Sequence, residues 1–487
     1  MTQNSMLMTQ IARKTVRILF LILAVCASWP NKTAAQAKKP NVVYFLVDNL
    51  GIGELSVYSG GPLRGTYTPH IDALAAEGMR LLNFAPETQC TPSRSALMTG
   101  RYSIRSGNQT VALAGSHGGL VKWERTMGDI FSEAGYATAI VGKWHIGDSP
   151  GRWPTDHGFD EWYGIPRSYD ESLWPADPWY RPGRDPVTRV LESRKGEPVH
   201  ELEQLTVEVR RDIDVEYMKR AKAFLKHSVT ANKPFFLYFN HSMMHMPTVP
   251  RAEFKGRTGH GEWADSLLEL DTDFGTLVDY LKELGLADNT IVVFTGDNGP
   301  EEMEPWRGDG GPWEGSYFTG MEGSLRTPAL VRYPGHVPTG QISNEIIHIT
   351  DMFTTLVSWA GLQIPTDRVI DGVDQRAFFE GKQKNSNRAG FLYWMGDTLY
   401  GVKWQNFKMV LVLQQTLSDP ALQLATPHLV NLDTDPKERK AYDYPYIHTW
   451  VGEHTAKLLI EYQESLKREP LIPVGAPLDY VPKQKQP

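Results

Sequence analysis

Two Asp-Asn pairs are the first residues of this chain whose types and spacing could do chemistry. Asp48 and Asn49 follow one apolar run of the sequence, and Asp297 and Asn298 follow another. Carboxylate and amide oxygens are hard ligands, which suit Ca²⁺ or Mg²⁺ better than Zn²⁺. One such pair alone is more often the start of a turn. The repetition of the pair after two separate runs favours a site for a divalent metal.

A single cysteine lies between these pairs. Cys90 begins the segment Cys-Thr-Pro-Ser-Arg, which ends at Arg94. The only other cysteine, Cys26, falls in a segment that we expect to be cleaved, so Cys90 would have no disulfide partner in an exported protein. A free cysteine is usually a small, buried apolar residue. The alternative is a chemical role, and the planar donors of Arg94 suit an anion at the same place.

Two further segments offer a cation and groups that transfer protons. Lys143 and His145 follow an apolar run with one residue between them, and on an extended segment this spacing points both side chains to the same side. The segment His-Ser-Met-Met-His-Met-Pro offers His241 and His245. Histidine exchanges protons near neutral pH. Taken singly, a lysine and a histidine near a strand end are more often surface and core residues.

The elements that would position these residues alternate along the chain. Four apolar runs, at residues 41–47, 137–141, 234–239 and 291–295, each end in a cluster of polar residues or glycine. Such runs are typical of parallel strands buried on both faces, and helical stretches lie between them. The pattern predicts an α/β fold with a large, mostly parallel central sheet flanked by helices. Ligands of such sheets bind beyond the carboxyl ends of the strands, where all four polar clusters fall.

The remaining segments divide the chain. We expect residues 38–385 to form the large α/β domain. Residues 386–487 should form a smaller α+β subdomain, an antiparallel sheet with one helix, because hairpin-like runs follow one another from about residue 390. Residues 165–211 are rich in Trp, Pro, Arg and Asp and show little periodicity. This insertion is either a cap that faces the substrate or a solvated surface loop.

The N-terminal residues have the pattern of a secretory signal. Basic residues precede a short apolar run, and Ala35-Gln36-Ala37 resembles a cleavage site, so we expect residues 1–37 to be removed and the protein to be periplasmic or secreted. The run is too short to span a bilayer. Residues 1–37 contain four basic residues and no acidic ones, so their removal takes the formal net charge from −7 to −11. This charge argues against nucleic acid as a partner.

Taken together, these segments resemble the sulfatases, of the alkaline phosphatase superfamily. The family motif C-x-P-S-R matches residues 90–94, and G-K-W-H-x-G matches residues 142–147. The segment Asn-Leu-Asp-Thr-Asp-Pro-Lys-Glu at residues 431–438 is similar to the family's usual C-terminal segment, and the resemblance covers roughly residues 40–440. It implies a sulfuric ester hydrolase of the arylsulfatase type, which would act on a small sulfate ester or a sulfated carbohydrate.

The resemblance also implies a role for each candidate residue. A maturation enzyme would oxidise Cys90 to formylglycine, whose hydrate attacks the sulfur. Calcium, with magnesium as the alternative, would be bound by the group at position 90 and by four further residues: Asp48, Asn49, Asp297 and Asn298. Arg94 would orient the formylglycine and, with Lys143, stabilise negative charge on the transferring group. His245 would protonate the leaving alcohol, His145 would take the proton of the second hydroxyl, and His241 would be structural.

Two positions depart from the family pattern. Most sulfatases have a second aspartate where this chain has Asn49, and many have a lysine where it has Tyr317, five residues before Glu322. The formal charge of the site, with the metal, stays at +2, so one hypothesis is that the two changes compensate each other. The other is that they are independent and that Arg307 replaces the lysine. Two other functions also stay open, hydrolysis of phosphonate or phosphate monoesters, and binding of sulfated glycans without catalysis.

Overall fold

The structure is a computed structural model that describes residues 39–115, 118–439 and 448–483. The predicted secretory signal, residues 1–37, lies outside these ranges. Within them, none of the helices combines the length and the apolar character that crossing a bilayer requires.

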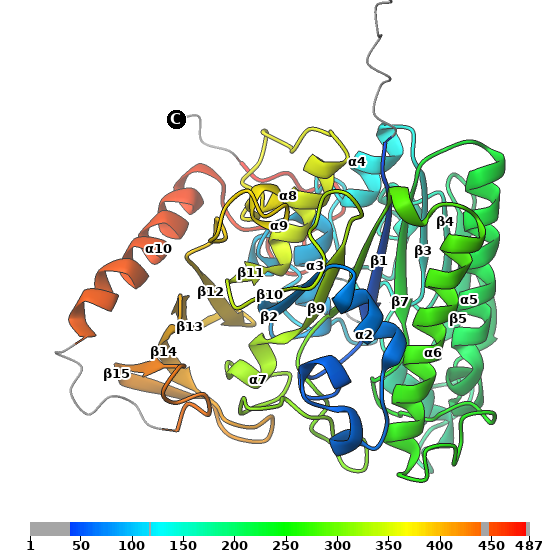
Figure 1. The fold of residues 1–487 in the computed structure, drawn as a ribbon, viewed down its shortest axis with the longest axis horizontal. Coiled ribbons are helices and arrows are strands. Elements are labelled where there is room, and N and C mark those ends of the chain that lie inside the picture. The colour runs from blue at the N-terminus through cyan, green and yellow to red at the C-terminus, as the bar shows by residue number, and fades with distance from the viewer. Residues whose placement is uncertain (1–38, 116–117, 440–447, 484–487) are drawn as a thin grey trace, which may run out of the picture. The chain divides into compact units, whose positions relative to one another are not determined.

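An eleven-stranded sheet carries the fold (Figure 1). Its strands lie in the order β10-β2-β9-β8-β1-β7-β3-β4-β5-β6, and β11 pairs with β2. The five strands from β8 to β4 run parallel to one another, whereas β9 and β5 run antiparallel to their neighbours. The predicted large, mostly parallel sheet is therefore confirmed. Its strands are β1 (Asn41–Val47), β2 (Met79–Ala85), β3 (Ala137–Val141), β4 (Glu161–Gly164), β5 (Arg189–Arg194), β6 (His200–Gln204), β7 (Phe235–His241), β8 (Thr290–Gly296), β9 (Thr327–Arg332), β10 (Gln341–Ser343) and β11 (Ile347–His348).

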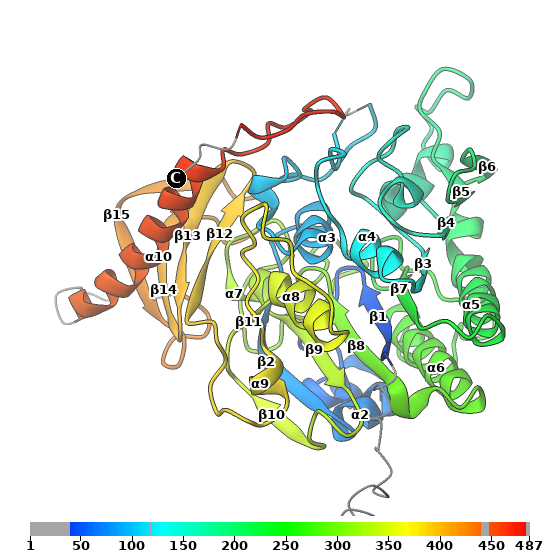
Figure 2. The same ribbon diagram turned by 90° about the horizontal axis from the view of Figure 1, so that it is seen from above.

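Helices cover both faces of this sheet (Figure 2). On one face lie α3 (Cys90–Thr99), α4 (Met127–Glu133) and α8 (Ile349–Trp359). On the other lie α2 (Pro69–Ala76), α5 (Val207–Thr230) and α6 (Glu262–Glu283). Successive residues of a strand point to opposite faces, so β1 contributes to the apolar cores on both sides. This two-sided burial explains why the central strands are continuous apolar runs in the sequence.

Short helices occupy the connections. They are α7 (Glu322–Leu325), α9 (Arg376–Phe379) and the 3₁₀ helices Ser56–Tyr58, Gly61–Arg64, Ser103–Arg105, Pro154–Asp156, Tyr169–Ala176 and Ala287–Asn289.

The segment 165–211 is more regular than its sequence indicated. It contains the 3₁₀ helix Tyr169–Ala176 and the strands β5 and β6, which extend the large sheet at one edge, and α5 begins within it. The pattern was hard to recognise because β6, His-Glu-Leu-Glu-Gln, is polar and largely exposed. The role of the segment 165–211 as a cap over the substrate stays a prediction.

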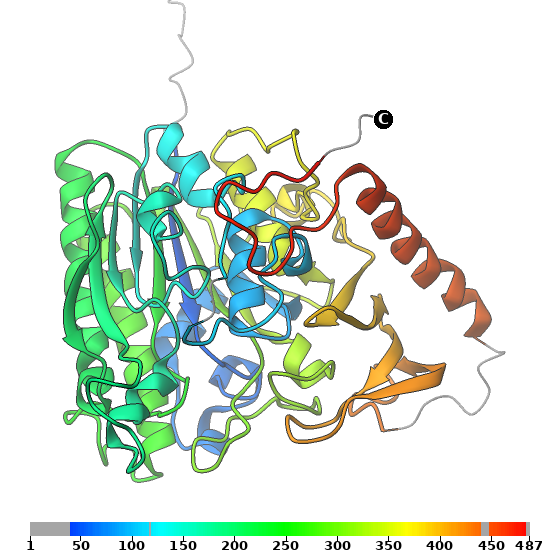
Figure 3. The ribbon, with the colours of Figure 1, turned by 180° about the vertical axis from the view of Figure 1, so that it is seen from behind.

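The C-terminal part forms a separate four-stranded antiparallel sheet, as predicted. Its strands are β12 (Gly390–Met395), β13 (Thr398–Trp404), β14 (Phe407–Leu413) and β15 (Leu422–Asn431), and α10 (Thr449–Arg468) packs against it. The segment after α10 then returns to the large-sheet part (Figure 3), where the Ile472 amide donates a hydrogen bond of 3.0 Å to the Arg105 carbonyl.

The parallel strands bring the polar clusters to one edge of the sheet. The Met244 amide, beyond β7, donates to the Asp48 carbonyl at 2.8 Å, and the Asp297 amide, after β8, donates to the Val47 carbonyl at 3.0 Å. Gly142, after β3, lets the chain approach closely: its φ is +109°, and a Cβ there would lie 2.2 Å from the Asn240 carbonyl oxygen. A residue with a side chain would push the Lys143 segment away from β7.

We therefore expect Gly142→Ala to lower the free energy of unfolding by about 3 kcal/mol, the sum of the strained backbone and the steric clash. Gly335→Ala is the matched control, because Gly335 also has a positive φ, +76°, but nothing lies within 4 Å of a Cβ there. Urea unfolding of both variants measures the difference. Equal losses of unfolding free energy in the two variants would show that the close approach of Gly142 to Asn240 does not require a glycine.

Candidate active site

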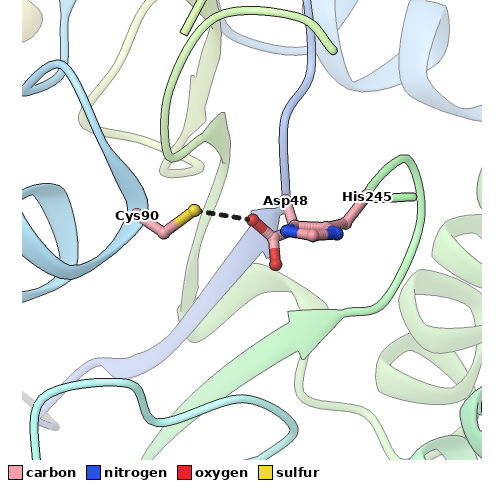
Figure 4. A group of neighbouring side chains, drawn as sticks. All are labelled: Asp48, Cys90 and His245. Atoms are coloured by element: carbon pink, nitrogen blue, oxygen red, sulfur yellow. Dashed lines mark hydrogen bonds between the residues drawn. The ribbon is translucent and has the colours of Figure 1, made fainter. Parts of the chain in front are cut away.

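The candidate active site lies at the carboxyl ends of β1 and β7 and the start of α3 (Figure 4). Asp48 follows β1, His245 lies in the loop after β7, and Cys90 is the first residue of α3. One ligand atom from each of the three lies within 4.8 Å of the other two, and Cys90 Sγ is 3.5 Å from Asp48 Oδ1. The structure thus brings together residues that are far apart in the sequence and whose atoms are close enough to share one ion.

Arg94 lies one helical turn after Cys90, and so on the same side of α3. Its Nε and Nη2 donate to Asp297 Oδ2 at 3.1 and 2.9 Å, and its Nη1 donates to the Lys143 carbonyl at 2.9 Å. The side chain is fully buried. In this structure Arg94 holds Asp297 and the Lys143 backbone in place; a direct contact with a formylglycine stays a prediction.

Lys143 forms the second buried ion pair of the site. Its Nζ donates to Asp48 Oδ2 at 2.8 Å and lies 3.4 Å from Ser168 Oγ. Burial opposes the charge on both partners, but their attraction prevails. The pKa of Lys143 is therefore raised, and Lys143, His245 and Arg94 hold the pKa of Asp48 well below its usual range. The site thus presents a charged lysine beside a charged aspartate.

The pKa values of Asp297 and Cys90 are raised, in contrast to that of Asp48. Burial and the charge of Asp48 raise the pKa of Asp297 to about 7, although Arg94 opposes the change. Burial, together with Asp48 and Asp297, raises the pKa of the Cys90 thiol well above its usual range despite Lys143. Acidic groups here are crowded, and a positive charge between them would relieve their repulsion.

The amide groups fit such a cation. Asn298 donates through Nδ2 to Asn49 Oδ1 at 2.6 Å and to the Gly299 carbonyl at 3.0 Å, and its buried Oδ1 has no hydrogen-bond partner in the part of the chain that the structure describes. Asn49 Oδ1 lies 3.7 Å from Cys90 Sγ. An unsatisfied buried oxygen, together with the carboxylates of Asp48 and Asp297, makes a set of residue types suited to a hard divalent cation.

His145 is placed to accept a proton. Its Nε2 lies 3.2 Å from the Ala112 carbonyl, which can only accept, so Nε2 carries the hydrogen and Nδ1 has the free lone pair. Nδ1 is buried and has no hydrogen-bond partner among the described residues. Burial, Lys143 and Arg94 hold the pKa of His145 well below its usual range, so the ring is neutral at neutral pH.

His245 has a different environment. Its Nδ1 lies 2.7 Å from the Met246 carbonyl, and its Nε2 lies 3.1 Å from Ser168 Oγ, the same hydroxyl that Lys143 approaches. Of the predicted site residues, only His245 and Cys90 are not fully buried, with 5% and 3% of their surface exposed. Both are buried, but they are the most accessible of the predicted site residues.

The other histidine of the same loop lies apart from this cluster. His241 is fully buried, its Nε2 lies 3.1 Å from Asp273 Oδ2, and its Nδ1 accepts from the Met243 amide at 3.2 Å. Burial opposes a charge on the ring, but Asp214 and Asp273 outweigh it and raise the pKa of His241. Its contacts are those of a structural residue.

Sequence reasoning missed two side chains of the site. Ser168 joins Lys143 to His245, and it follows shortly after the end of β4. Glu301 is buried and accepts a hydrogen bond of 3.1 Å from Asn49 Nδ2. Its position three residues after Asn298, beyond β8, was the available signal.

The structure places Tyr317, which stands where many sulfatases have the lysine, and Arg307, which the sequence offered as its replacement. Tyr317 lies beside Glu301 and forms a side-chain hydrogen bond with it. Arg307 is exposed, and it lines with Glu301 a cleft of about 490 Å³. Within the described ranges, the Arg307 side chain makes no hydrogen bond or ion pair with a predicted site residue.

The fold and the site together define a hydrolase with a deep, charged centre for an anionic ester. The model of the family described as Sulfatase matches residues 40–362, and that of the N-sulphoglucosamine sulphohydrolase C-terminal domain matches residues 317–464. The N-acetylgalactosamine-6-sulfatase of Canis lupus familiaris is 34% identical over 420 residues, 82% of this chain and 76% of that protein. Arylsulfatase A of Homo sapiens is 34% identical over 443 residues, 86% of this chain and 85% of that protein.

The solved structures agree. The PsFucS1 sulfatase from Pseudoalteromonas sp. superposes with a TM-score of 0.83 at 30% identity, over 90% of this chain and 92% of that chain. The chain therefore belongs to the sulfatase family, and it is a sulfuric ester hydrolase.

The two histidines of the β7 loop should differ in their effect on stability. His241→Ala leaves two buried carboxylates, Asp214 and Asp273, without their shared partner, and we expect it to lower the free energy of unfolding by about 2–4 kcal/mol. His245→Ala, at one of the more accessible positions of the site, should cost less than about 1 kcal/mol. Urea unfolding measures both, and a larger loss for His245→Ala would contradict this assignment.

Proposed function

We propose that this sulfatase cleaves sulfate monoesters of carbohydrates through a formylglycine formed from Cys90 and a bound divalent cation. The observation that carries the proposal is the position of Cys90: it begins α3 within a C-x-P-S-R segment, and its Sγ lies 3.5 Å from Asp48 in the group that also contains His245. A maturation enzyme that generates formylglycine is then a required partner.

The cation would be calcium rather than magnesium, because four oxygen-bearing side chains besides the group at position 90 are available, whereas magnesium usually keeps several waters and binds only one or two carboxylates. Asp48, Asn49, Asp297, Asn298 and the oxidised Cys90 would hold it. Bound there, it supplies positive charge that lowers the pKa of a hydroxyl and polarises the sulfate oxygens.

The remaining steps depend on side chains of the chain itself. Lys143 lies at the site with its charge retained, so it can bind a sulfate oxygen and stabilise the charge that develops on it. His245 would donate a proton to the leaving alcohol from Nε2, the atom next to Ser168. His145 would accept the proton of the second formylglycine hydroxyl at Nδ1, its free lone pair.

A carbohydrate is the substrate class that we propose. Relatives of the chain include an enzyme named for the 6-sulfate of N-acetylgalactosamine. The cleft beside Glu301 is lined by polar and charged residues and by Trp313, a surface suited to a sugar ring and its hydroxyls. We also propose that the protein is exported, as its N-terminal sequence indicates.

The proposal predicts that Cys90→Ala abolishes turnover of sulfate esters and leaves thermal unfolding nearly unchanged, because one small side chain is removed. Cys90→Ser should allow one transfer and then retain the sulfate, since a serine has no second hydroxyl to expel it. Mass spectrometry of the wild-type peptide that contains position 90 should show an aldehyde.

Each alternative has its own outcome in the same experiment. A retained thiol in an inactive wild type would support a glycan-binding protein without catalysis. An aldehyde with turnover of phosphonate or phosphate esters far above that of sulfate esters would support the alternative hydrolase. Near-normal turnover by Cys90→Ala would exclude the formylglycine mechanism.

A second prediction concerns the leaving group. His245→Ala should slow esters of poor leaving groups, such as sugar alcohols, by roughly 10²–10⁴-fold, and activated aryl esters much less, because only the former need a proton donor. The measurement is kcat for a series of sulfate esters with alcohols of increasing pKa. A uniform loss across the series would contradict the role of His245 as the acid.

A further inference from the structure

Glu301 is a buried carboxylate beside the proposed cation site, and no role in the reaction has been assigned to it. It is 1% exposed, and no lysine or arginine of the described ranges forms an ion pair with it. Its partners are Asn49 Nδ2 at 3.1 Å, the Tyr317 side chain, and the Glu302 amide at 3.2 Å. Burying a carboxylate without a cation is costly, so its retention here needs a reason.

The contact with Asn49 supplies one. An ionised carboxylate can only accept hydrogen bonds, so the Asn49 side chain must turn its Nδ2 toward Glu301 and its Oδ1 the other way. Oδ1 then lies 3.7 Å from Cys90 Sγ, among the proposed ligands. The Asn49 backbone is fixed as well, because its amide donates to Asp297 Oδ1 at 3.1 Å and its φ is +57°. Only the rotation of the amide group remains, and two contacts fix it: Glu301 accepts from Nδ2, and Asn298 Nδ2 donates to Oδ1 at 2.6 Å.

We propose that Glu301 is a positioning residue of the cation site: it orients the Asn49 amide so that oxygen rather than NH₂ faces the ion. It also supplies, one hydrogen bond further from the ion, the negative charge of the aspartate that most sulfatases have at position 49. This inference rests on the cation of the proposed function.

Tyr317 completes the arrangement. Its side chain is hydrogen-bonded to Glu301. The two positions that depart from the family pattern, Asn49 and Tyr317, therefore both contact the same carboxylate. The compensation inferred from the sequence considered these two positions alone. Including Glu301 lowers the formal charge of the site from +2 to +1, and it gives the two changes a shared partner.

The test is the affinity of the purified protein for calcium, measured by titration calorimetry with calcium chloride after chelation. Glu301→Gln should weaken calcium binding by roughly 10–100-fold, the usual effect of losing a group that orients a metal ligand. Glu304→Gln is the matched control, because Glu304 is three residues away and exposed, and its affinity should equal that of the wild type. An unchanged affinity of Glu301→Gln would overturn the proposal.

A double variant guards against a simple folding defect. Asn49→Asp alone places a second carboxylate in contact with that of Glu301. The repulsion between them should lower the melting temperature of the metal-free protein. The double variant Asn49→Asp, Glu301→Gln moves the negative charge from position 301 to position 49, next to the ion, and the new glutamine amide can donate to the new aspartate. It should restore calcium affinity to within about 3-fold of the wild type. Purely additive losses in this cycle would also overturn the proposal.

The wild type separates this inference from the proposed function. If it binds no calcium and none is found in the protein as purified, the cation of the proposed function fails, and the positioning role with it. If it binds calcium and Glu301→Gln binds equally well, only the positioning role fails.

Discussion

Four fully buried ionisable side chains at the carboxyl ends of the central strands are the constraint on which the rest of the structure depends. Arg94 binds Asp297 through two nitrogens, Lys143 binds Asp48, and Arg94 also lies 3.5 Å from Asp48. Buried charges are tolerated only when they are paired with good geometry. The four residues come from α3 and from the segments after β1, β3 and β8, so these three strands must end, and α3 must begin, at one place.

This pairing also determines what the site can do. The charged pairs are fully buried, whereas Cys90 and His245 are the slightly more accessible residues of the site. The two histidines that would exchange protons have different surroundings: His145 is buried and neutral with a free Nδ1, whereas the Nε2 of His245 faces Ser168. Two groups of one type placed in different environments are a common way for an enzyme to separate an acid from a base.

The departures from the family pattern alter the formal charge of this centre, which is +1 rather than +2 when Glu301 and the proposed cation are both included. Asn49 has no charge, but Glu301 stands 3.1 Å behind its amide nitrogen, and Tyr317 contacts Glu301 where many relatives would have a cation. The negative charge is thus kept in the site, one hydrogen bond away from the place proposed for the cation. A sulfate monoester carries one negative charge, which a centre of formal charge +1 still attracts.

Much of the fold and part of the site followed from the sequence alone. The apolar runs predicted the central strands, because a strand covered by helices on both faces must be apolar throughout. The polar clusters marked the strand ends, whereas the helix that places Cys90 and Arg94 on one side was not predicted. The strands β5 and β6 escaped notice, because β5 has only Val190 and Leu191 as apolar residues and β6, the edge strand, is largely polar and exposed.

Only the tertiary structure decided which of these residues meet. It brought His245 rather than His241 to Cys90, added Ser168 and Glu301, and directed the donors of Arg94 to Asp297. Local periodicity determines which face of an element a side chain occupies, and the sequence carries that information within a few residues. Contacts between positions such as Asn49 and Glu301, 252 residues apart, depend on the order and register of the strands, which the packing of the whole sheet determines.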